Sequence, residues 1–313
     1  MTLAILCSGQ GTQHRDMFAL TADAPEAAGV FAAATEALGC DPRAFVHESS
    51  DATMHANAAG QILCVTQALA GFAALTSVVE SLSGRTTIAG YSIGELAAWG
   101  CAGLFTPAAT IDLARQRAAM MDEAGAPGDG LAFVRGLHGQ RIDALCARHA
   151  CAVAIINPGE TFILGGDRIE LGALCDEALR QGASKAGALK VNAASHTPRL
   201  KAASARYRQA LAAERPLQRP PSRIRLISGI DAAAVLNVEA GLDKLAAQIS
   251  QTIDWAACLE ACVEAGVDRF IELGPGRALA NMTSEAYPKI PARGLEDFRG
   301  LDGVRAWLAK SQG

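Results

Sequence analysis

Residues 87–95 read TIAGYSIGE, an apolar run that leads into a serine between two glycines. Residues 87–91 predict a strand, and helix-favouring residues follow at once from Glu95. The segment matches the pattern G-x-S-x-G, in which glycines allow a tight turn from strand to helix. Such a turn lifts the hydroxyl of Ser92 to the helix N-terminus, where the amide of Ile93 faces a developing oxyanion. The alternative is a glycine-rich turn in which Ser92 only caps the helix.

Strands and helices alternate on both sides of this segment. Residues 2–7 predict a short buried strand, followed by a glycine-containing loop at 8–13. Thr106-Pro107 predicts a helix start, because a capping residue precedes a proline in the first turn, and the helix should reach about Ala124. Further strands are expected at 224–228 and 270–273. Repeated strand-then-helix units predict an α/β fold.

The pattern changes after the break GAPGDG at 125–130. The order of expected elements beyond it is β-α-β-β-α-β, which is the split ferredoxin-like unit. We predict a small inserted domain at 126–192 and a large α/β domain made of 1–125 and 193–313. The expected strands of the insert are 131–135, 151–156, 161–164 and 188–191, and its helices are 140–149 and 167–181.

Composition indicates a folded chain with a large core, because half of the residues are hydrophobic and 19% are charged. None of the nine cysteines forms a CxxC pair, which favours buried reduced thiols over a metal site and predicts a cytoplasmic protein. The N-terminus lacks the basic residue of a signal peptide. Residues 52–79 contain no Asp, Glu, Lys or Arg, but polar interruptions such as Gln61 favour a buried helix over a membrane span.

A serine nucleophile needs a base. Of six histidines, His196 follows the last strand of the predicted insert, so we expect it in the cleft between the domains. Arg117 lies among apolar residues at helical spacing, where its charge requires an anion. That anion could be a structural partner such as Glu95 or the carboxylate of a substrate.

The stretch from Lys185 to Arg225 holds ten lysines and arginines and a single acidic residue, Glu214. This excess charge predicts an anionic partner such as coenzyme A phosphates, an acidic carrier protein or nucleic acid. Tyr207 is the only aromatic residue in it, which argues against nucleic acid. The alternative is a solvated helix face.

Six stretches, in order along the chain, resemble the malonyl-CoA:acyl-carrier-protein transacylase family. The resemblance covers nearly the whole sequence and includes the family's GQGxQ loop and a GYSIGE version of its GHSxGE elbow. The matching segments are Gly9–Gln13, Gly90–Glu95, Arg117 before Met121–Ala124, Ser195-His196, Gln248 before Ile253–Trp255, and Glu272–Gly276.

The resemblance implies a large α/β-hydrolase-like domain with a parallel sheet and a small ferredoxin-like insert. It implies that malonyl passes from malonyl-CoA to a serine and then to the thiol arm of an acyl carrier protein, by covalent ping-pong catalysis. No metal, redox cofactor, nucleic acid or membrane is implied. The implied roles are nucleophile for Ser92, base for His196, oxyanion amides for Gln10 and Ile93, malonyl clamp for Arg117, and placement of His196 or the thioester for Gln248.

One position departs from the family pattern. Tyr91 stands where most members have His, and GYSIGELAAWG is similar to the malonate decarboxylase branch. The epsilon subunit of that branch loads malonyl onto the carrier of its own complex, which implies malonate decarboxylase subunits as partners. Tyr91 adjoins the nucleophile, so it could alter acyl or carrier preference. The open alternatives are a fatty-acid-synthesis transacylase, a serine thioesterase or esterase, and a non-catalytic carrier-docking subunit.

Overall fold

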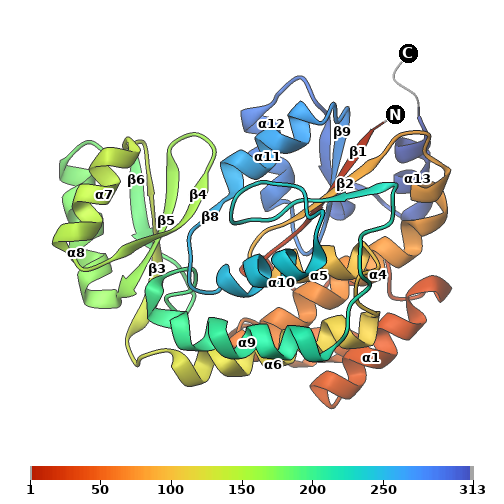
Figure 1. Ribbon diagram of the computed structural model, residues 1–313, viewed down its shortest axis with the longest axis horizontal. Coiled ribbons are helices and arrows are strands. Elements are labelled where there is room, and N and C mark those ends of the chain that lie inside the picture. Colours follow the sequence, from red (N-terminus) through yellow and green to blue (C-terminus); the bar gives the residue numbers. More distant parts are fainter. Residues whose placement is uncertain (1, 311–313) are drawn as a thin grey trace.

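The structure is a computed structural model that describes residues 2–310. Its larger part is built on a five-stranded sheet in the order β10-β9-β1-β2-β7, and every neighbouring pair is parallel (Figure 1). Strands β1, β2 and β9 are buried along their whole length, as expected of parallel strands covered on both faces. The strands are β1 (Leu3–Cys7), β2 (Thr86–Gly90), β7 (Ile224–Leu226), β9 (Arg269–Leu273) and β10 (Ala292–Gly294).

Alternate residues of β1 enter different cores. Leu3 and Ile5 join a core that includes side chains of α4, α5, α6 and α9, whereas Ala4 and Leu6 join one that includes α11 and α12. Figure 1 shows these helices on opposite sides of the sheet. The helices of this part are α1 (Ala28–Leu38), α2 (Pro42–Glu48), α3 (Asp51–Met54), α4 (Asn57–Ser81), α5 (Ile93–Cys101), α6 (Pro107–Ala124), α9 (Lys201–Ala213), α10 (Val238–Ala247), α11 (Trp255–Glu264), α12 (Ala278–Ala286) and α13 (Leu301–Ala309).

Helix α4 contains most of the uncharged stretch. By length and composition it could span a membrane, but 72% of its most apolar window is buried inside the protein. This burial agrees with the prediction of a core helix. The nine cysteines are all free, and seven are buried. The expectation of burial is wrong for Cys40, which is exposed, and Cys151 is half-buried.

The smaller part follows the predicted order β-α-β-β-α-β. Its strands are β3 (Asp129–Arg135), β4 (Ala152–Asn157), β5 (Thr161–Asp167) and β6 (Lys185–Ala188), with helices α7 (Gly139–Arg148) and α8 (Arg168–Arg180). The sheet order is β6-β3-β5-β4-β8, and its pairs are antiparallel except β4 with β8. Strand β8 (Ile253–Asp254) lies far beyond residue 192 in the chain. The small sheet is therefore not built from the predicted insert alone.

The last strand of the insert differs from the prediction, because β6 spans 185–188 rather than 188–191. The apolar residues Leu189 and Val191 suggested the later range. They instead line the cavity at Ser92, although the amide of Leu189 still donates to the Leu131 oxygen of β3 at 2.8 Å.

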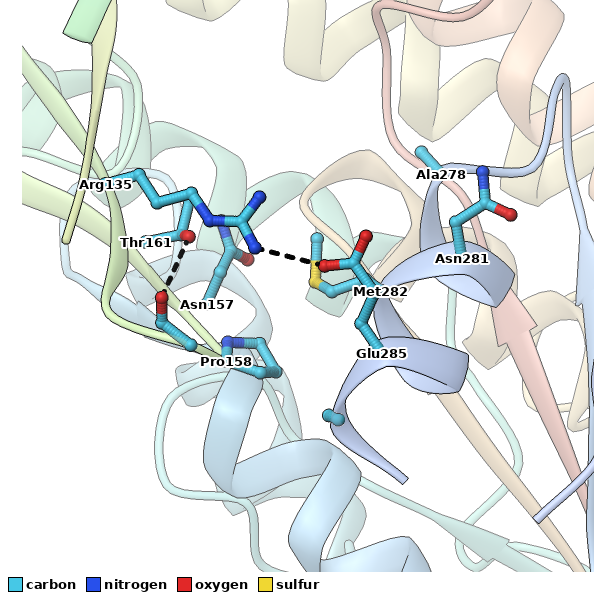
Figure 2. Close-up of a pocket in the computed structure, with 10 residues that line it drawn as sticks. Arg135, Asn157, Pro158, Thr161, Ala278, Asn281, Met282 and Glu285 are labelled. Atoms are coloured by element: carbon cyan, nitrogen blue, oxygen red, sulfur yellow. Dashed lines mark hydrogen bonds and ion pairs between the residues drawn. The ribbon is translucent and has the colours of Figure 1, made fainter. Parts of the chain in front are cut away.

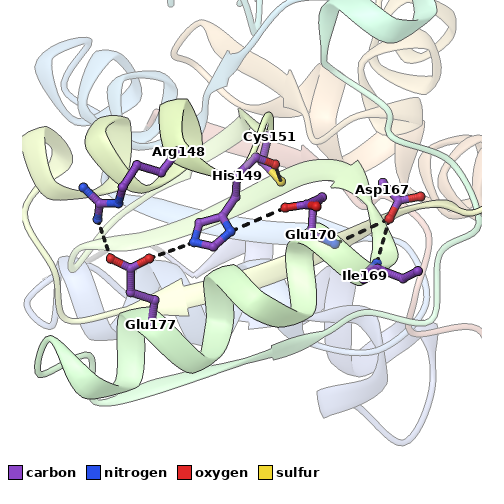
Figure 3. A network of polar contacts seen from close by, with 7 residues as sticks. All are labelled: Arg148, His149, Cys151, Asp167, Ile169, Glu170 and Glu177. Carbon is purple, nitrogen blue, oxygen red and sulfur yellow. Dashed lines mark hydrogen bonds and ion pairs between the residues drawn. The ribbon is translucent and has the colours of Figure 1, made fainter.

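A polar network joins the two helices of the small part (Figure 3). His149, directly after α7, places Nε2 2.8 Å from Glu177 and Nδ1 3.5 Å from Glu170, both on α8. Arg148 bonds the other oxygen of Glu177 at 2.7 Å. The hydrogen bond from His149 and the contacts of Arg148 lower the pKa of Glu177. These contacts fix α7 against α8 beside the core of the small sheet.

Candidate active site

Ser92 lies in the strained turn that the sequence predicts. It follows β2 and precedes α5, with φ 57° and ψ −120°. A Cβ atom on Gly94 would lie 2.0 Å from the carbonyl oxygen of Cys7, and one on Gly90 would lie 2.0 Å from that of Gly94. Only glycine fits at these two positions. The Ser92 side chain makes no capping hydrogen bond, so the alternative of a simple N-cap is wrong.

The hydroxyl of Ser92 contacts His196 instead. Ser92 Oγ lies 2.8 Å from His196 Nε2, and His196 Nδ1 contacts the backbone oxygen of Gln248. A carbonyl can only accept, so Nδ1 carries the proton and Nε2 is free to accept from the serine. Burial, assisted by the charge of Arg117, lowers the pKa of His196 to about 3. The imidazole is therefore neutral near pH 7 and can act as a base.

Gln248 contacts the site with both its backbone and its side chain. The sequence predicts that it places His196 or the thioester, and its backbone oxygen does contact His196. Its Nε2 donates to the backbone oxygen of Ser92 at 2.9 Å and to Glu95 Oε2 at 3.2 Å. Its Oε1 accepts from Arg117 Nη2 at 3.2 Å.

Arg117 is buried, with 1% of its surface exposed. Its Nη1 donates to Gln61 Oε1 at 2.8 Å, and its Nη2 donates to Gln248. Burial lowers its pKa to about 10, so the guanidinium stays charged near pH 7. Within residues 2–310 no ion pair joins Arg117 directly to Glu95, because Gln248 lies between them and bonds both. Their charges still interact, since Arg117 lowers the pKa of Glu95 and Glu95 raises that of Arg117. The sequence reasoning missed Gln61 as a partner, although a glutamine in an apolar helix was the available signal.

A cavity of about 220 Å³ opens beside Ser92 and His196. Gln10 and Tyr91 line it, together with apolar side chains of the small sheet such as Leu131 and Ile163. Ile93 directly follows Ser92 as the first residue of α5, where helix amides lack intrahelical partners. The structure thus brings Gln10, Ile93 and Tyr91 close to Ser92. Arg117 does not line this cavity and is connected to the site through Gln248.

Tyr91 connects the nucleophile turn with the small sheet. Its ring meets Trp255 edge to face, with centroids 5.4 Å apart and planes at 81°. Burial raises the pKa of Tyr91 to about 12, against the opposing effect of a hydrogen bond with the Asn157 side chain. Asn157 ends β4, so Tyr91, the neighbour of Ser92, is held by the smaller part of the fold.

A second cavity of about 430 Å³ lies between the small sheet and α12 (Figure 2). It shares Ala278 and Met282 with the cavity at Ser92, so the two adjoin. Arg135 on β3 and Glu285 on α12 approach from opposite sides and form an ion pair at 3.2 Å.

Residues 5–296 match the acyl transferase domain family. The chain belongs to this family. This acyl transferase is 28% identical over 305 residues to the malonyl CoA-acyl carrier protein transacylase of Escherichia coli K12, covering 94% of this chain and 96% of that protein. Its fold matches the acyl-carrier-protein S-malonyltransferase of Burkholderia pseudomallei 1710b, with a TM-score of 0.89, 27% identity and coverage of 98% and 100%. It also matches MCAT from Mycobacterium tuberculosis, with a TM-score of 0.88, 26% identity and coverage of 99% and 100%.

The basic stretch of the acyl transferase is less positive than its sequence suggests. Arg206 and Arg208 on α9 pair with acidic residues of α6 and α10, and Arg199 pairs with Asp129 at 2.9 Å. Lys201 at the start of α9 is exposed. Several positive charges of the predicted anion-attracting surface are therefore already paired with carboxylates of the same chain.

Proposed function

We propose that this acyl transferase moves a malonyl group from malonyl-CoA to the thiol arm of an acyl carrier protein. The observation that carries the proposal is the 2.8 Å contact between Ser92 Oγ and His196 Nε2 at the bottom of a cavity. The substrate class is supported by the names of the relatives, which are malonyl transferases acting with acyl carrier protein.

The first half-reaction forms an acyl-enzyme. His196 Nε2 takes the proton of Ser92 as Oγ attacks the thioester carbonyl, and the oxyanion faces the amides of Gln10 and Ile93. The tetrahedral intermediate then breaks its C–S bond, and His196 returns the proton to the departing thiolate of coenzyme A. The backbone oxygen of Gln248 stabilises the imidazolium between these steps.

The second half-reaction repeats these steps with the carrier. His196 takes the proton of the carrier thiol, whose sulfur attacks the Ser92 ester. When the ester bond breaks, His196 protonates Ser92 and the free enzyme is restored. Side chains and backbone amides supply every group in this sequence, so the proposed reaction requires no metal or redox cofactor.

Arg117 would select the dicarboxylic acyl group. Its guanidinium is buried and has only neutral glutamine oxygens as hydrogen-bond partners among the contacts of residues 2–310. A malonyl carboxylate supplies a direct anionic partner, whereas an acetyl group leaves the guanidinium with neutral contacts and with Glu95 beyond Gln248. The carboxylate would take N–H groups of the guanidinium that Gln61 and Gln248 leave free, so Arg117 keeps its contact with Gln248.

The two adjoining cavities would serve the two ends of the substrate. The inner cavity at Ser92 holds the acyl group, and the outer cavity, between the small sheet and α12, admits the thiol arm of coenzyme A or of the carrier. An arm that fills the outer cavity also excludes water, which would otherwise hydrolyse the acyl-enzyme. A thioesterase on the same fold differs from a transferase in this respect.

The cognate carrier is the finer part of the proposal. The Tyr91-containing elbow favours the carrier of malonate decarboxylase, with subunits of that complex as partners. The fatty-acid-synthesis carrier fits the names of the relatives at least as well. Both carriers place the reaction in the cytoplasm, which is our proposed location.

The experiment is a transfer assay with malonyl-CoA and each purified holo-carrier in turn, together with a measurement of free malonate. Faster malonylation of the decarboxylase carrier supports the finer assignment, and faster malonylation of the fatty-acid carrier overturns it. Malonate release that no carrier suppresses would identify a hydrolase. Binding to a carrier without any acyl-enzyme would identify a docking subunit.

A further inference from the structure

Gln248 contacts three residues of the proposed site, namely His196, Ser92 and Arg117. Its backbone oxygen contacts His196, its Nε2 bonds the backbone of Ser92, and its Oε1 holds Arg117. A glutamine amide is nearly symmetric in shape, so either end fits the same space. The reversed amide would aim an NH₂ group at the guanidinium, and the hydrogen bond to Arg117 would be lost.

Glu95 provides an acceptor that opposes this reversal. Its Oε2 accepts from Gln248 Nε2 at 3.2 Å, and the backbone amide of Gly229 also bonds the carboxylate. A Cβ on residue 229 would lie 2.8 Å from Glu95 Oε2, so glycine allows this close approach. Glu95 is 1% exposed, and its Oε1 has no hydrogen-bond partner in residues 2–310. Burial of a carboxyl group with so few partners is costly, and it raises the pKa of Glu95 to about 7.

We infer that Glu95 is a positioning residue that fixes the amide orientation of Gln248, and through it holds Arg117 ready for the carboxylate of the acyl group. This inference rests on the proposed function and adds a specificity-determining residue to it. Glu95 does not line the cavity at Ser92, so it acts without touching the substrate. We call this path of contacts, from Gly229 and Glu95 through Gln248 to Arg117, the relay.

The relay separates recognition of the acyl group from the chemistry of the nucleophile. The contact of His196 is with the backbone of Gln248, which a change at Glu95 leaves in place. Arg117, in contrast, contacts the side chain of Gln248. Two acceptors orient that side chain, the backbone oxygen of Ser92 and Glu95 Oε2, and a change at Glu95 removes the second. Loss of Glu95 should therefore weaken transfer of malonyl much more than transfer of acetyl.

The test compares Glu95→Met, which keeps the length but removes the acceptor, with Glu95→Gln, which keeps an acceptor oxygen and removes the charge. We expect Glu95→Met to lower kcat/KM for malonyl-CoA by about 10- to 100-fold relative to acetyl-CoA, the range for a misplaced binding group. Glu95→Gln should restore the malonyl-to-acetyl ratio to within about threefold of the wild type, because its oxygen can orient Gln248.

Asp129→Leu is the control for the loss of a buried carboxylate. Asp129 is also buried, but it bonds Arg199 rather than Gln248 and does not line the cavity at Ser92. Its loss should affect malonyl and acetyl transfer alike. An unchanged malonyl-to-acetyl ratio in Glu95→Met, or the same change in Asp129→Leu, would overturn the inference.

Crystal structures of Glu95→Met and Glu95→Gln provide a readout that does not depend on the substrate. We expect the Gln248 side chain to leave Arg117 in the Met variant and to remain on it in the Gln variant. An Arg117–Gln248 contact that survives in Glu95→Met would overturn the relay even if malonyl transfer is confirmed. If Gln248 is displaced in Glu95→Met but the wild-type protein never accepts malonyl, the relay is supported and only the proposed function is refuted.

Discussion

The Oγ of Ser92 lies 2.8 Å from the Nε2 of His196, although 104 positions separate them in the chain. Both residues have positive φ angles, of 57° and 62°. Backbone conformations of this kind are costly for residues other than glycine and are found where a functional geometry requires them. The contact is therefore built into the turns of the fold and does not depend on a chance rotamer.

The identity of the acyl group should depend on Arg117. Arg117→Ala should lower kcat/KM for malonyl-CoA by at least about 100-fold, because a buried charge pair with the substrate is worth several kcal/mol. Acetyl transfer should fall much less. Steady-state assays with both thioesters measure the ratio, and equal losses would show that Arg117 only supports the structure.

The rate of Ser92 acylation should respond weakly to acid. A histidine of ordinary pKa would lose about 30-fold of its neutral form by pH 5, whereas the pKa of His196 is lowered to about 3. We expect quenched-flow acylation rates to stay level between pH 8 and pH 5. Arg117→Ala removes a positive charge that disfavours the imidazolium, so it should raise the pKa of His196. The acylation rate of this variant should therefore begin to fall at a higher pH than that of the wild type. A wild-type rate that falls with a midpoint near pH 6.5 would contradict this account.

The nucleophile turn should tolerate no side chain at Gly94. In Gly94→Ala the new Cβ would meet the Cys7 carbonyl at 2.0 Å, so we expect a loss of at least about 3 kcal/mol in the free energy of unfolding. Gly172, exposed on α8 with open space around it, is the control. Gly172→Ala should raise the free energy of unfolding by about 0.5–1 kcal/mol. Urea denaturation measures both, and comparable stability of the two variants would refute the steric argument.

The turn at Ser92 could be predicted from sequence because its information is local, whereas the places of Gln10 and Gln248 came from the family resemblance. The elbow needs glycines at fixed offsets from Ser92, and strand β1 is a continuous apolar run. Contacts between the backbones of distant segments cannot be predicted in this way, because they require no particular residue types. The partner of His196 is the main chain of Gln248, which any residue type could provide. The pairing of β8 with β4 likewise depends on how two distant segments meet, and two residues carry no periodic pattern.

The carrier surface can be tested by reversing charges on α9. Lys201→Glu should raise KM for an acidic carrier several-fold more than KM for malonyl-CoA, since it removes an exposed positive charge. Arg206→Glu should have a smaller effect on carrier binding, because Arg206 is already paired with Glu123. Arg299→Glu, at an exposed position outside the basic stretch, is the control. If KM for the carrier is the same in all three variants, α9 is not the docking surface.

The most direct test of the account is the intact-protein mass after brief incubation with malonyl-CoA, with acetyl-CoA in parallel and Ser92→Ala as the control. We expect a malonyl adduct on the wild type, a much weaker acetyl adduct, and no adduct on Ser92→Ala. A malonyl adduct that persists in Ser92→Ala, or a wild type that remains unmodified, would contradict the assignment of Ser92 as the acyl-carrying nucleophile.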